Sequence, residues 1–196
     1  MPVKVVVVGA GPGGMFASYL LSKHGLDVTL VEMGEDVEER MNKINGGGPD
    51  AGPNYIQGMG GSGTFSDGKI NLNPEIGGNM LEFVGASDAQ KLIDYVDNLF
   101  IKYGMEKESQ IHPKAKDLTM RAMKAGIKFI PIKQKHIGSD FLPKIVAGIR
   151  KEMEQKGVKI LTKTMATDLM VKDRKAKGVV IQRKGKEEKL DADYVV

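Results

Sequence analysis

Three glycines close to the N-terminus have the spacing needed to hold a phosphate group. The pattern G-x-G-x-x-G is formed by Gly9, Gly11 and Gly14, and it directly follows an unbroken run of valines at 5–8. In such a pattern the first glycine allows a tight turn, the second lets the backbone approach a pyrophosphate, and the third lets a helix pack closely on a strand. The N–H groups and the dipole at the start of that helix favour an anion. The spacing therefore predicts a phosphate-binding turn between a strand and a helix.

A carboxylate stands where a ribose would need a hydrogen-bond acceptor. Glu32 lies eighteen residues after Gly14, beyond the alternating apolar segment 26–30. An acidic residue at about this distance accepts hydrogen bonds from the ribose of a dinucleotide. We therefore interpret 4–32 as a dinucleotide-binding unit of strand, helix and strand. The alternative is a glycine-rich structural turn inside an α/β core.

A second glycine-rich segment, 46–78, is the other candidate for ligand contact, and its centre reads GMGGSGTFSDGK at 58–69. A loop of this length without periodicity is uncommon in a compact domain unless it is functional. Clustered glycines bring the main chain close to a ligand, and the hydroxyl groups of Ser62, Thr64 and Ser66 offer hydrogen bonds without charge. This composition favours a polar uncharged or anionic ligand over a metal. The alternative is a mobile loop.

Four further side chains have types that can carry chemistry. His136 is a candidate catalytic group because histidine exchanges protons near neutral pH, and the alternative is a histidine hydrogen-bonded at the start of a helix. Asp67 and Lys69 are expected to form an ion pair that holds the loop rather than to react. Arg40 either reaches a phosphate or lies on the surface.

Composition excludes several classes of function. The 196 residues carry a net charge of +4 and include no cysteine. Disulfides, thiolate metal sites and a dithiol redox centre are therefore excluded, and a cytoplasmic location is expected. No segment has the pattern of a signal peptide or the length of a membrane span. The densest charged run, 172–189, mixes both signs, so we interpret it as solvated hairpin surface and expect no binding to nucleic acid. No membrane partner is expected either, and the expected partner is a small-molecule substrate.

The hydrophobic pattern predicts the elements that position these groups. Helical spacing of apolar residues predicts helices at 87–103, at 117–125 and between Asp140 and Gly157, the first with a capping box formed by Ser87 and Gln90. A short helix is expected at 35–40, and strands are expected at 128–132 and 158–161. From 164 onward the pattern alternates, which predicts a three-stranded antiparallel meander and then a further strand at 192–196.

The order of these elements predicts an α/β fold. We expect a Rossmann-like domain with a parallel sheet, an antiparallel β-meander crossover and an inserted helical or mixed segment. The nucleotide-binding unit and the glycine-rich loop are assigned to 1–74, an inserted subdomain to 75–135, and the return to the first domain to 136–196. Because the chain stops within an apolar strand, it is expected to be truncated, with the C-terminal half of the same protein as its partner.

The glycine turn and the segment after it resemble the FAD-binding fingerprint of the glutathione-reductase-type flavoproteins. The matching positions are Gly9, Gly11, Gly14, Ala17, Leu20, Gly25, Val28 and Glu32. The meander and the ADYVV segment also resemble that fold. More narrowly, three stretches resemble a family of FAD-utilising dehydrogenases: GGSGTFSDGKIN at 60–71, KHIGSD at 135–140 and LPKIVAGIRKEMEQKGVKI at 142–160. The resemblance covers essentially the whole chain and about the first half of that family's usual length.

The resemblance implies an FAD-dependent oxidoreductase in which the flavin transfers a hydride or electrons, with NAD(P)H as a candidate donor. Glu32 would hold the adenosine ribose, the backbone of Ala166 would contact the adenine, and the 60–67 tract would lie along the pyrophosphate, ribitol or flavin ring. The residues implied to bind FAD are Gly9, Ala10, Gly11, Pro12, Gly13, Gly14, Glu32, Met33, Arg40, Gly60, Gly61, Ser62, Gly63, Thr64, Ser66, Asp67 and Ala166.

Two other functions stay open. An NAD-binding dehydrogenase domain would use the same turn, and Glu32 would disfavour the 2′-phosphate of NADP. The meander and the long glycine-rich tract argue against this simpler domain. A non-catalytic scaffold could keep the flavoprotein-like fold without a cofactor, but the complete glycine pattern with Glu32 argues against that loss.

Overall fold

The computed structural model describes residues 2–46, 55–108, 111 and 113–196. The chain forms two compact units, one of Met1–Ser66 and Leu142–Val196, the other of Asp67–Phe141. The predicted boundaries 1–74, 75–135 and 136–196 divide the chain at other positions and stay a prediction. The 47–54 part of the glycine-rich segment lies outside the described residues.

A parallel sheet forms the centre of the first unit. Its strand order is β5-β2-β1-β9, and all three pairings are parallel. The strands are β1 (Lys4–Val8), β2 (Asp27–Val31), β5 (Lys159–Leu161) and β9 (Tyr194–Val195). The side chains of Val5, Val6 and Val7 are all buried, as expected for a strand covered on both faces. The predicted α/β fold with a parallel sheet is confirmed.

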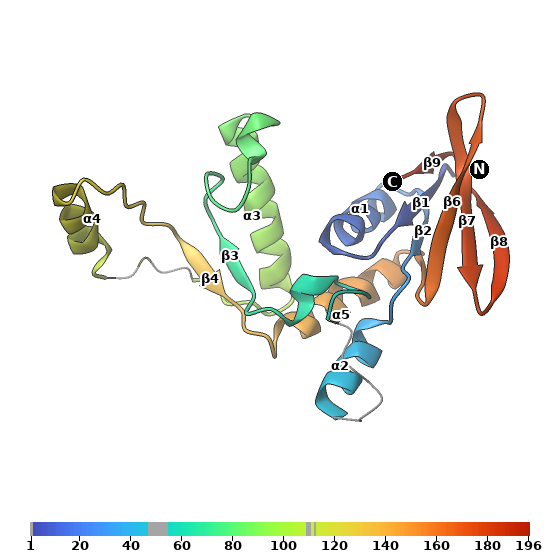
Figure 1. Ribbon diagram of the computed structural model, residues 1–196, viewed down its shortest axis with the longest axis horizontal. Helices are drawn as coiled ribbons and strands as arrows, with labels where there is room; N and C mark the ends of the chain where they lie inside the picture. Colours follow the sequence, from blue (N-terminus) through green and yellow to red (C-terminus); the bar gives the residue numbers. More distant parts are fainter. Residues whose placement is uncertain (1, 47–54, 109–110, 112) are drawn as a thin grey trace. The chain divides into compact units, whose positions relative to one another are not determined.

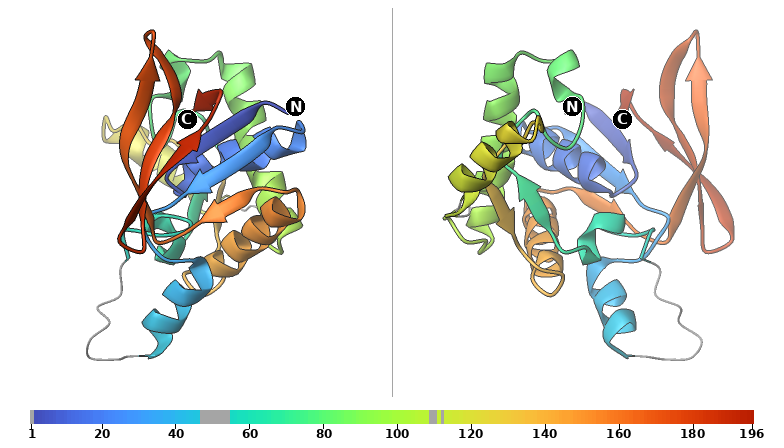
Figure 2. Two further views of the ribbon diagram at one scale, coloured as in Figure 1. Left: turned by 90° about the vertical axis from the view of Figure 1, so that its right-hand side faces the viewer. Right: turned by 60° about the vertical axis from the view of Figure 1, so that its left-hand side comes forward.

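The two faces of the sheet are covered by different layers. Figures 1 and 2 show α1 (Pro12–Lys23) on one side of β1 and β2, and the strands β6 (Thr164–Lys172), β7 (Lys175–Arg183) and β8 (Lys186–Asp191) on the other. On the meander side, Val6 and Val31 pack with Val179, Ile181 and Ala192 in one buried cluster. The alternation of a strand sends Val7 to the opposite face, toward α1.

The meander is antiparallel, as predicted from its alternating pattern. β6 pairs with β7 and β7 pairs with β8, with a register shift between Ala166 and Asp168. The chain then returns to the parallel sheet, where β9 pairs with β1. The predicted crossover and the strand that follows it are therefore confirmed.

Two further helices of the first unit pack on the α1 side. α5 (Leu142–Gln155) buries Ile145, Val146, Ile149 and Met153 along one face. The hydroxyl group of Tyr19 on α1 donates to Oε1 of Glu152 on α5 at 3.1 Å. α2 (Val37–Gly46) also contacts α5, together with the short helix η1 (Ser62–Phe65). The helix expected at 35–40 therefore begins later and runs further than predicted.

The second unit is built from short strands and helices. It contains β3 (Lys69–Asn71), η2 (Met80–Glu82), α3 (Ala86–Lys102), α4 (Ala115–Lys124) and β4 (Gln134–His136). β3 and β4 pair antiparallel, with Lys69 opposite His136. The buried amine of Lys135 forms an ion pair with Asp97 of α3 at 2.8 Å. This pair fixes β4 against α3.

Two details of the second unit differ from the sequence predictions. The strand expected at 128–132 is absent from the described residues, and β4 begins only at Gln134. Pro131 explains the difference, because proline has no N–H to donate to a neighbouring strand. The expected capping box is also wrong: α3 begins at Ala86, its N-cap is Gly85, and no side chain among the described residues caps it.

Candidate functional site

The glycine turn joins β1 to α1 in the way its spacing predicted. Gly9 has a φ of +96°, which favours glycine. A Cβ on Gly14 would lie 1.8 Å from the carbonyl oxygen of Gly9, so only glycine lets α1 approach β1 this closely. Added Cβ atoms at Gly11 and Gly13 would meet no described atom within 4 Å. The turn is therefore tightly packed at Gly14, where α1 meets β1, and open at Gly11 and Gly13.

The start of α1 offers N–H groups to a ligand. α1 begins at Pro12 with Gly11 as its N-cap, and no side chain among the described residues caps it. Pro12 and Gly13 are exposed, and Ala10 is buried. An open helix N-terminus attracts anions through its N–H groups and its dipole.

Glu32 lies directly beneath this turn, where β2 ends. Its side chain is only 6% exposed. Its Oε2 accepts a hydrogen bond from the N–H of Ala10 at 2.7 Å. Its Oε1 accepts from the N–H groups of Gly34 at 2.8 Å and Gly58 at 3.0 Å. One carboxylate therefore joins the glycine turn, the loop after β2 and the second glycine-rich segment.

The segment 58–61 forms a wall beside the turn. The N–H of Gly60 donates to the carbonyl oxygen of Ala10 at 2.8 Å. A Cβ on Gly61 would lie 3.2 Å from the Cα of Gly11 and 3.3 Å from the Cδ of Pro12. Gly58, Gly60 and Gly61 all have positive φ values. The glycines thus allow the two glycine-rich segments to lie backbone against backbone.

Arg40 of α2 holds the same segment from the other side. Its side chain is 2% exposed, so the alternative of a surface arginine is wrong. The guanidinium donates to the carbonyl oxygens of Met59 at 2.6 Å, Gly61 at 3.0 Å and Tyr55 at 3.1 Å. It also lies over the ring of Phe65, 4.8 Å from the ring centroid. Burial lowers the pKa of Arg40, and the negative charges of Glu32 and Glu35 oppose that shift. The predicted contact with a phosphate stays a prediction.

The hydroxyl side chains after Gly61 have different environments. Ser62 and Gly63 are exposed at the start of η1. Thr64 is 1% exposed, and its hydroxyl has no hydrogen-bond partner among the described residues. The hydroxyl of Ser66 donates to the carbonyl oxygen of Gly63 at 2.8 Å. Met33 is exposed beside Glu32.

Ala166 lies in β6, opposite Ile181 of β7. It packs against the buried cluster between the meander and the sheet. The strand begins beside the Glu32 loop, because the N–H of Thr164 donates to the carbonyl oxygen of Glu32 at 2.9 Å. The predicted contact of the Ala166 backbone with adenine stays a prediction.

The remaining candidates belong to the second unit. Asp67 and Lys69 form an exposed ion pair of 2.7 Å, as expected. The hydrogen bond from Lys69 is the largest of the effects that lower the pKa of Asp67. His136 is exposed at the end of β4, opposite Lys69, and α5 begins only at Leu142. The alternative of a histidine at a helix start is therefore wrong, and its catalytic role stays a prediction.

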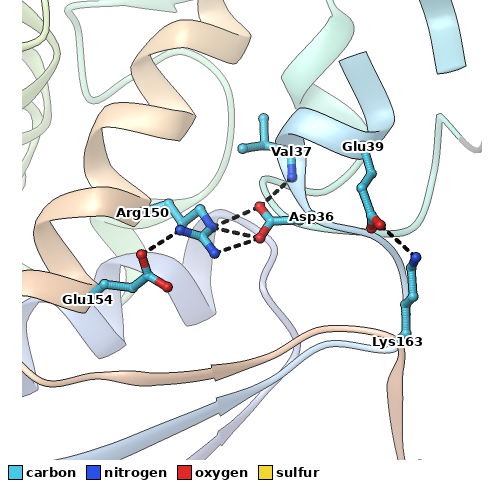
Figure 3. A network of polar contacts seen from close by, with 6 residues as sticks. All are labelled: Asp36, Val37, Glu39, Arg150, Glu154 and Lys163. Atoms are coloured by element: carbon cyan, nitrogen blue, oxygen red, sulfur yellow. Dashed lines mark hydrogen bonds and ion pairs between the residues drawn. The ribbon is translucent and has the colours of Figure 1, made fainter. Parts of the chain in front are cut away.

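A polar network near the start of α2 was not found from the sequence. Figure 3 shows it: the guanidinium of Arg150 on α5 donates from Nε to both carboxylate oxygens of Asp36, at 2.8 and 2.7 Å. Asp36 also accepts from the N–H of Val37 at 2.7 Å. Lys163 pairs with Glu39 of α2 at 2.7 Å. The partners are more than a hundred positions apart, so no local pattern could have indicated them.

Comparison with known proteins agrees with this geometry. The family model of the NAD(P)-binding Rossmann-like domain matches residues 7–66. This range holds the glycine turn, Glu32, Arg40 and the 58–61 wall. Residues 7–66 are thus similar to an NAD(P)-binding Rossmann-like domain.

A curated relative of this chain is an uncharacterized protein of Clostridium beijerinckii (strain ATCC 51743 / NCIMB 8052). It is 30% identical over 183 residues, which are 91% of this chain and 28% of the relative. The chain thus spans little more than a quarter of the relative's length.

Solved structures share the fold of the Rossmann-like domain and of the rest of the chain. A 3-ketosteroid-Δ4-(5α)-dehydrogenase from Rhodococcus jostii RHA1, in complex with 4-androstene-3,17-dione, matches with a TM-score of 0.57 and 18% identity, covering 97% of this chain and 44% of its own. The glycerol-3-phosphate dehydrogenase from Bacillus halodurans complexed with FAD matches with a TM-score of 0.51 and 12% identity, covering 99% and 33%. The resemblance to the N-terminal portion of FAD-utilising dehydrogenases is confirmed at the level of the fold.

Among the helices within the described residues, none has the length and apolar character required to cross a membrane.

Proposed function

We propose that the protein is an FAD-dependent oxidoreductase and that the first unit of this chain holds the adenosine and pyrophosphate of FAD. The observation that carries the proposal is the open N-terminus of α1 at the glycine turn, with the buried carboxylate of Glu32 beneath it and the 58–61 segment beside it. The shared fold of a dehydrogenase complexed with FAD supports the choice of cofactor.

The residues present fit such a cofactor. The open space above Gly11 and Gly13 would let a pyrophosphate approach the backbone N–H groups. A carboxylate has about four acceptor positions, and the described hydrogen bonds of Glu32 use three of them. Acceptor capacity therefore remains for a ribose hydroxyl group. Ser62 and Ser66, which follow the 58–61 segment, are exposed, so their hydroxyl groups can also form hydrogen bonds with a ligand.

Bound FAD would supply hydride or electron transfer, while the protein orients it. In this proposal the chain's own part is to bind the cofactor, and His136 would move a proton during turnover. NAD(P)H is the proposed electron donor, and the substrate is proposed to be a small molecule. A cytoplasmic location, expected from the lack of cysteine, also stays a proposal.

NAD in the same site is the second candidate, because the family model that matches residues 7–66 describes an NAD(P)-binding domain. Glu32 would then accept the ribose hydroxyls of NAD and repel the 2′-phosphate of NADP. A non-catalytic scaffold would bind neither dinucleotide.

Binding measurements separate these candidates. The protein is purified, its visible spectrum is recorded, and any cofactor released on denaturation is identified by chromatography. Purified protein freed of cofactor is then titrated with FAD, NAD and NADP by calorimetry. We expect FAD to bind at least tenfold more tightly than NAD. Tighter binding of NAD would support the dehydrogenase alternative, and binding of none of the three would support the scaffold.

A further inference from the structure

Arg40 and Glu32 hold the 58–61 segment through its own peptide groups. Glu32 accepts from the N–H of Gly58 at 3.0 Å, and Arg40 donates to the carbonyl oxygens of Met59 at 2.6 Å and Gly61 at 3.0 Å. Each charge therefore contacts the pole of the peptide dipole that carries the opposite partial charge. Hydrogen bonds to charged groups are the strong ones in proteins.

The contact between Arg40 and the 58–61 segment is buried and closely packed. A Cβ on Gly58 would lie 2.6 Å from the Cδ of Arg40. A buried guanidinium without partners is costly, so its placement requires the carbonyl oxygens that surround it. Phe65 covers the guanidinium with its ring face, which also favours the cation.

We propose that Arg40 is a positioning residue, which fixes the 58–61 segment as the second wall of the dinucleotide site instead of contacting the phosphates itself. Its described donors point to the backbone of the segment, and the segment in turn donates from Gly60 to Ala10 of the glycine turn. The effect of Arg40 on cofactor affinity rests on the proposed function. Its effect on the conformational order of the 58–61 segment does not.

The test is amide hydrogen exchange in the ligand-free protein, so its result does not depend on which cofactor binds. Three backbone N–H groups report on the order of the segment, and each donates to a backbone carbonyl oxygen. Met59 donates to that of Glu35 at 2.9 Å, Gly60 to that of Ala10 at 2.8 Å, and Gly61 to that of Gly58 at 2.8 Å. In Arg40→Lys the charge stays, but the planar fork that serves several carbonyl groups is lost. We expect exchange at these three amides to rise at least tenfold, with the amides of β1 and β2 unchanged.

Arg174→Lys is the matched control, since Arg174 is exposed at the turn between β6 and β7. It should leave all of these rates unchanged. If Arg40→Lys does not fold, the same exchange measurement is made on Phe65→Leu. This variant keeps Arg40 but removes the aromatic ring that covers its guanidinium. A smaller rise at the same amides is then expected. Exchange rates within twofold of the parent protein in the folded variant would overturn the proposal.

A second measurement separates positioning from direct contact with phosphate. ADP, which shares adenosine and pyrophosphate with FAD and NAD, is titrated into each folded variant. Weaker ADP binding together with faster loop exchange supports positioning. Weaker ADP binding with unchanged loop exchange would overturn positioning and assign Arg40 to the phosphates. Absence of ADP binding in the parent protein would contradict the proposed function and leave the exchange test in force.

Discussion

At the scale of single residues, the glycine turn has two kinds of glycine. Gly14 is required by packing, because its α-hydrogens face the carbonyl oxygen of Gly9, whereas Gly13 faces open space. The sequence pattern assigns the two to one motif, and only the structure separates their roles.

Gly14→Ala should destabilise the protein even without a ligand. The new Cβ would lie 1.8 Å from a backbone oxygen, so α1 must move away from β1. We expect the free energy of unfolding to fall by about 3 kcal/mol, the upper end of the usual cost of overpacking. Gly13→Ala is the control and should change stability by less than about 1 kcal/mol. Urea unfolding followed by circular dichroism measures both, and equal stabilities would contradict the packing role.

Glu32 has a structural role as well as a proposed role in binding. In Glu32→Gln one oxygen acceptor is replaced by an N–H donor, which faces backbone N–H groups. We expect a loss of about 2 kcal/mol in the free energy of unfolding of the ligand-free protein. Glu38→Gln, at an exposed position of α2, is the control. Unchanged stability in Glu32→Gln with weakened FAD binding would restrict Glu32 to the ligand.

At the scale of elements, ion pairs tie α2 to the segments around it. Asp36 precedes α2 and binds Arg150 of α5, and Glu39 of α2 binds Lys163 between β5 and β6. Since Arg40 lies on the same helix, the position of α2 also determines the position of the 58–61 wall.

The Asp36–Arg150 pair should contribute measurable coupling. Both side chains are about four-fifths buried, and the guanidinium reaches both carboxylate oxygens. Burial lowers the pKa of Arg150, but the hydrogen bond to Glu154 and the charge of Asp36 outweigh it and raise the pKa. A double-mutant cycle with Asp36→Asn and Arg150→Met should give about 1 kcal/mol. The exposed pair Asp88–Lys91 is the control and should give close to zero.

The Glu39–Lys163 pair predicts a pH dependence. The hydrogen bond from Lys163 is the main cause that lowers the pKa of Glu39, and the same bond raises the pKa of Lys163. Folding therefore favours ionised Glu39, so its stabilising effect is present above the ordinary carboxyl pKa and is lost as pH falls through the lowered value. The urea midpoint of the parent protein should exceed that of Glu39→Gln at neutral pH, and the two should converge as the pH falls from about 4.3, the ordinary glutamate pKa, through the lowered pKa of Glu39. A difference independent of pH would contradict this origin.

The elements differ in how far the sequence could predict them. The turn, Glu32 and the meander were found because glycine spacing and strict alternation are local patterns. β3 was missed because three residues carry no periodicity, and its partner β4 lies more than sixty positions away. The contacts of Arg40 were not predicted for a similar reason. Its partners are backbone carbonyl groups, which every residue type carries, so the residue types of 55–61 do not indicate them.

At the scale of the whole molecule, the second unit begins and ends at neighbouring positions. The N–H of Ile137 donates to the backbone carbonyl oxygen of Gly68 at 3.1 Å, and the N–H of Gly138 donates to the backbone carbonyl oxygen of Asp67 at 3.0 Å. Because residues 67–68 and 137–138 are hydrogen-bonded to each other, a short turn could connect them in place of the residues between them.

Replacement of 69–136 by an Asn-Gly turn between Gly68 and Ile137 should therefore leave the first unit folded. Asn-Gly suits a two-residue connection between antiparallel segments. We expect cooperative urea unfolding and an affinity for FAD within about tenfold of the parent protein, because Glu32, Arg40 and the glycine turn all belong to the first unit. Insertion of the same turn after Gly185, with nothing removed, controls for the turn itself. Loss of cooperative unfolding in the deletion alone would show that the first unit requires 69–136, and the interpretation of that segment as an insertion would be wrong.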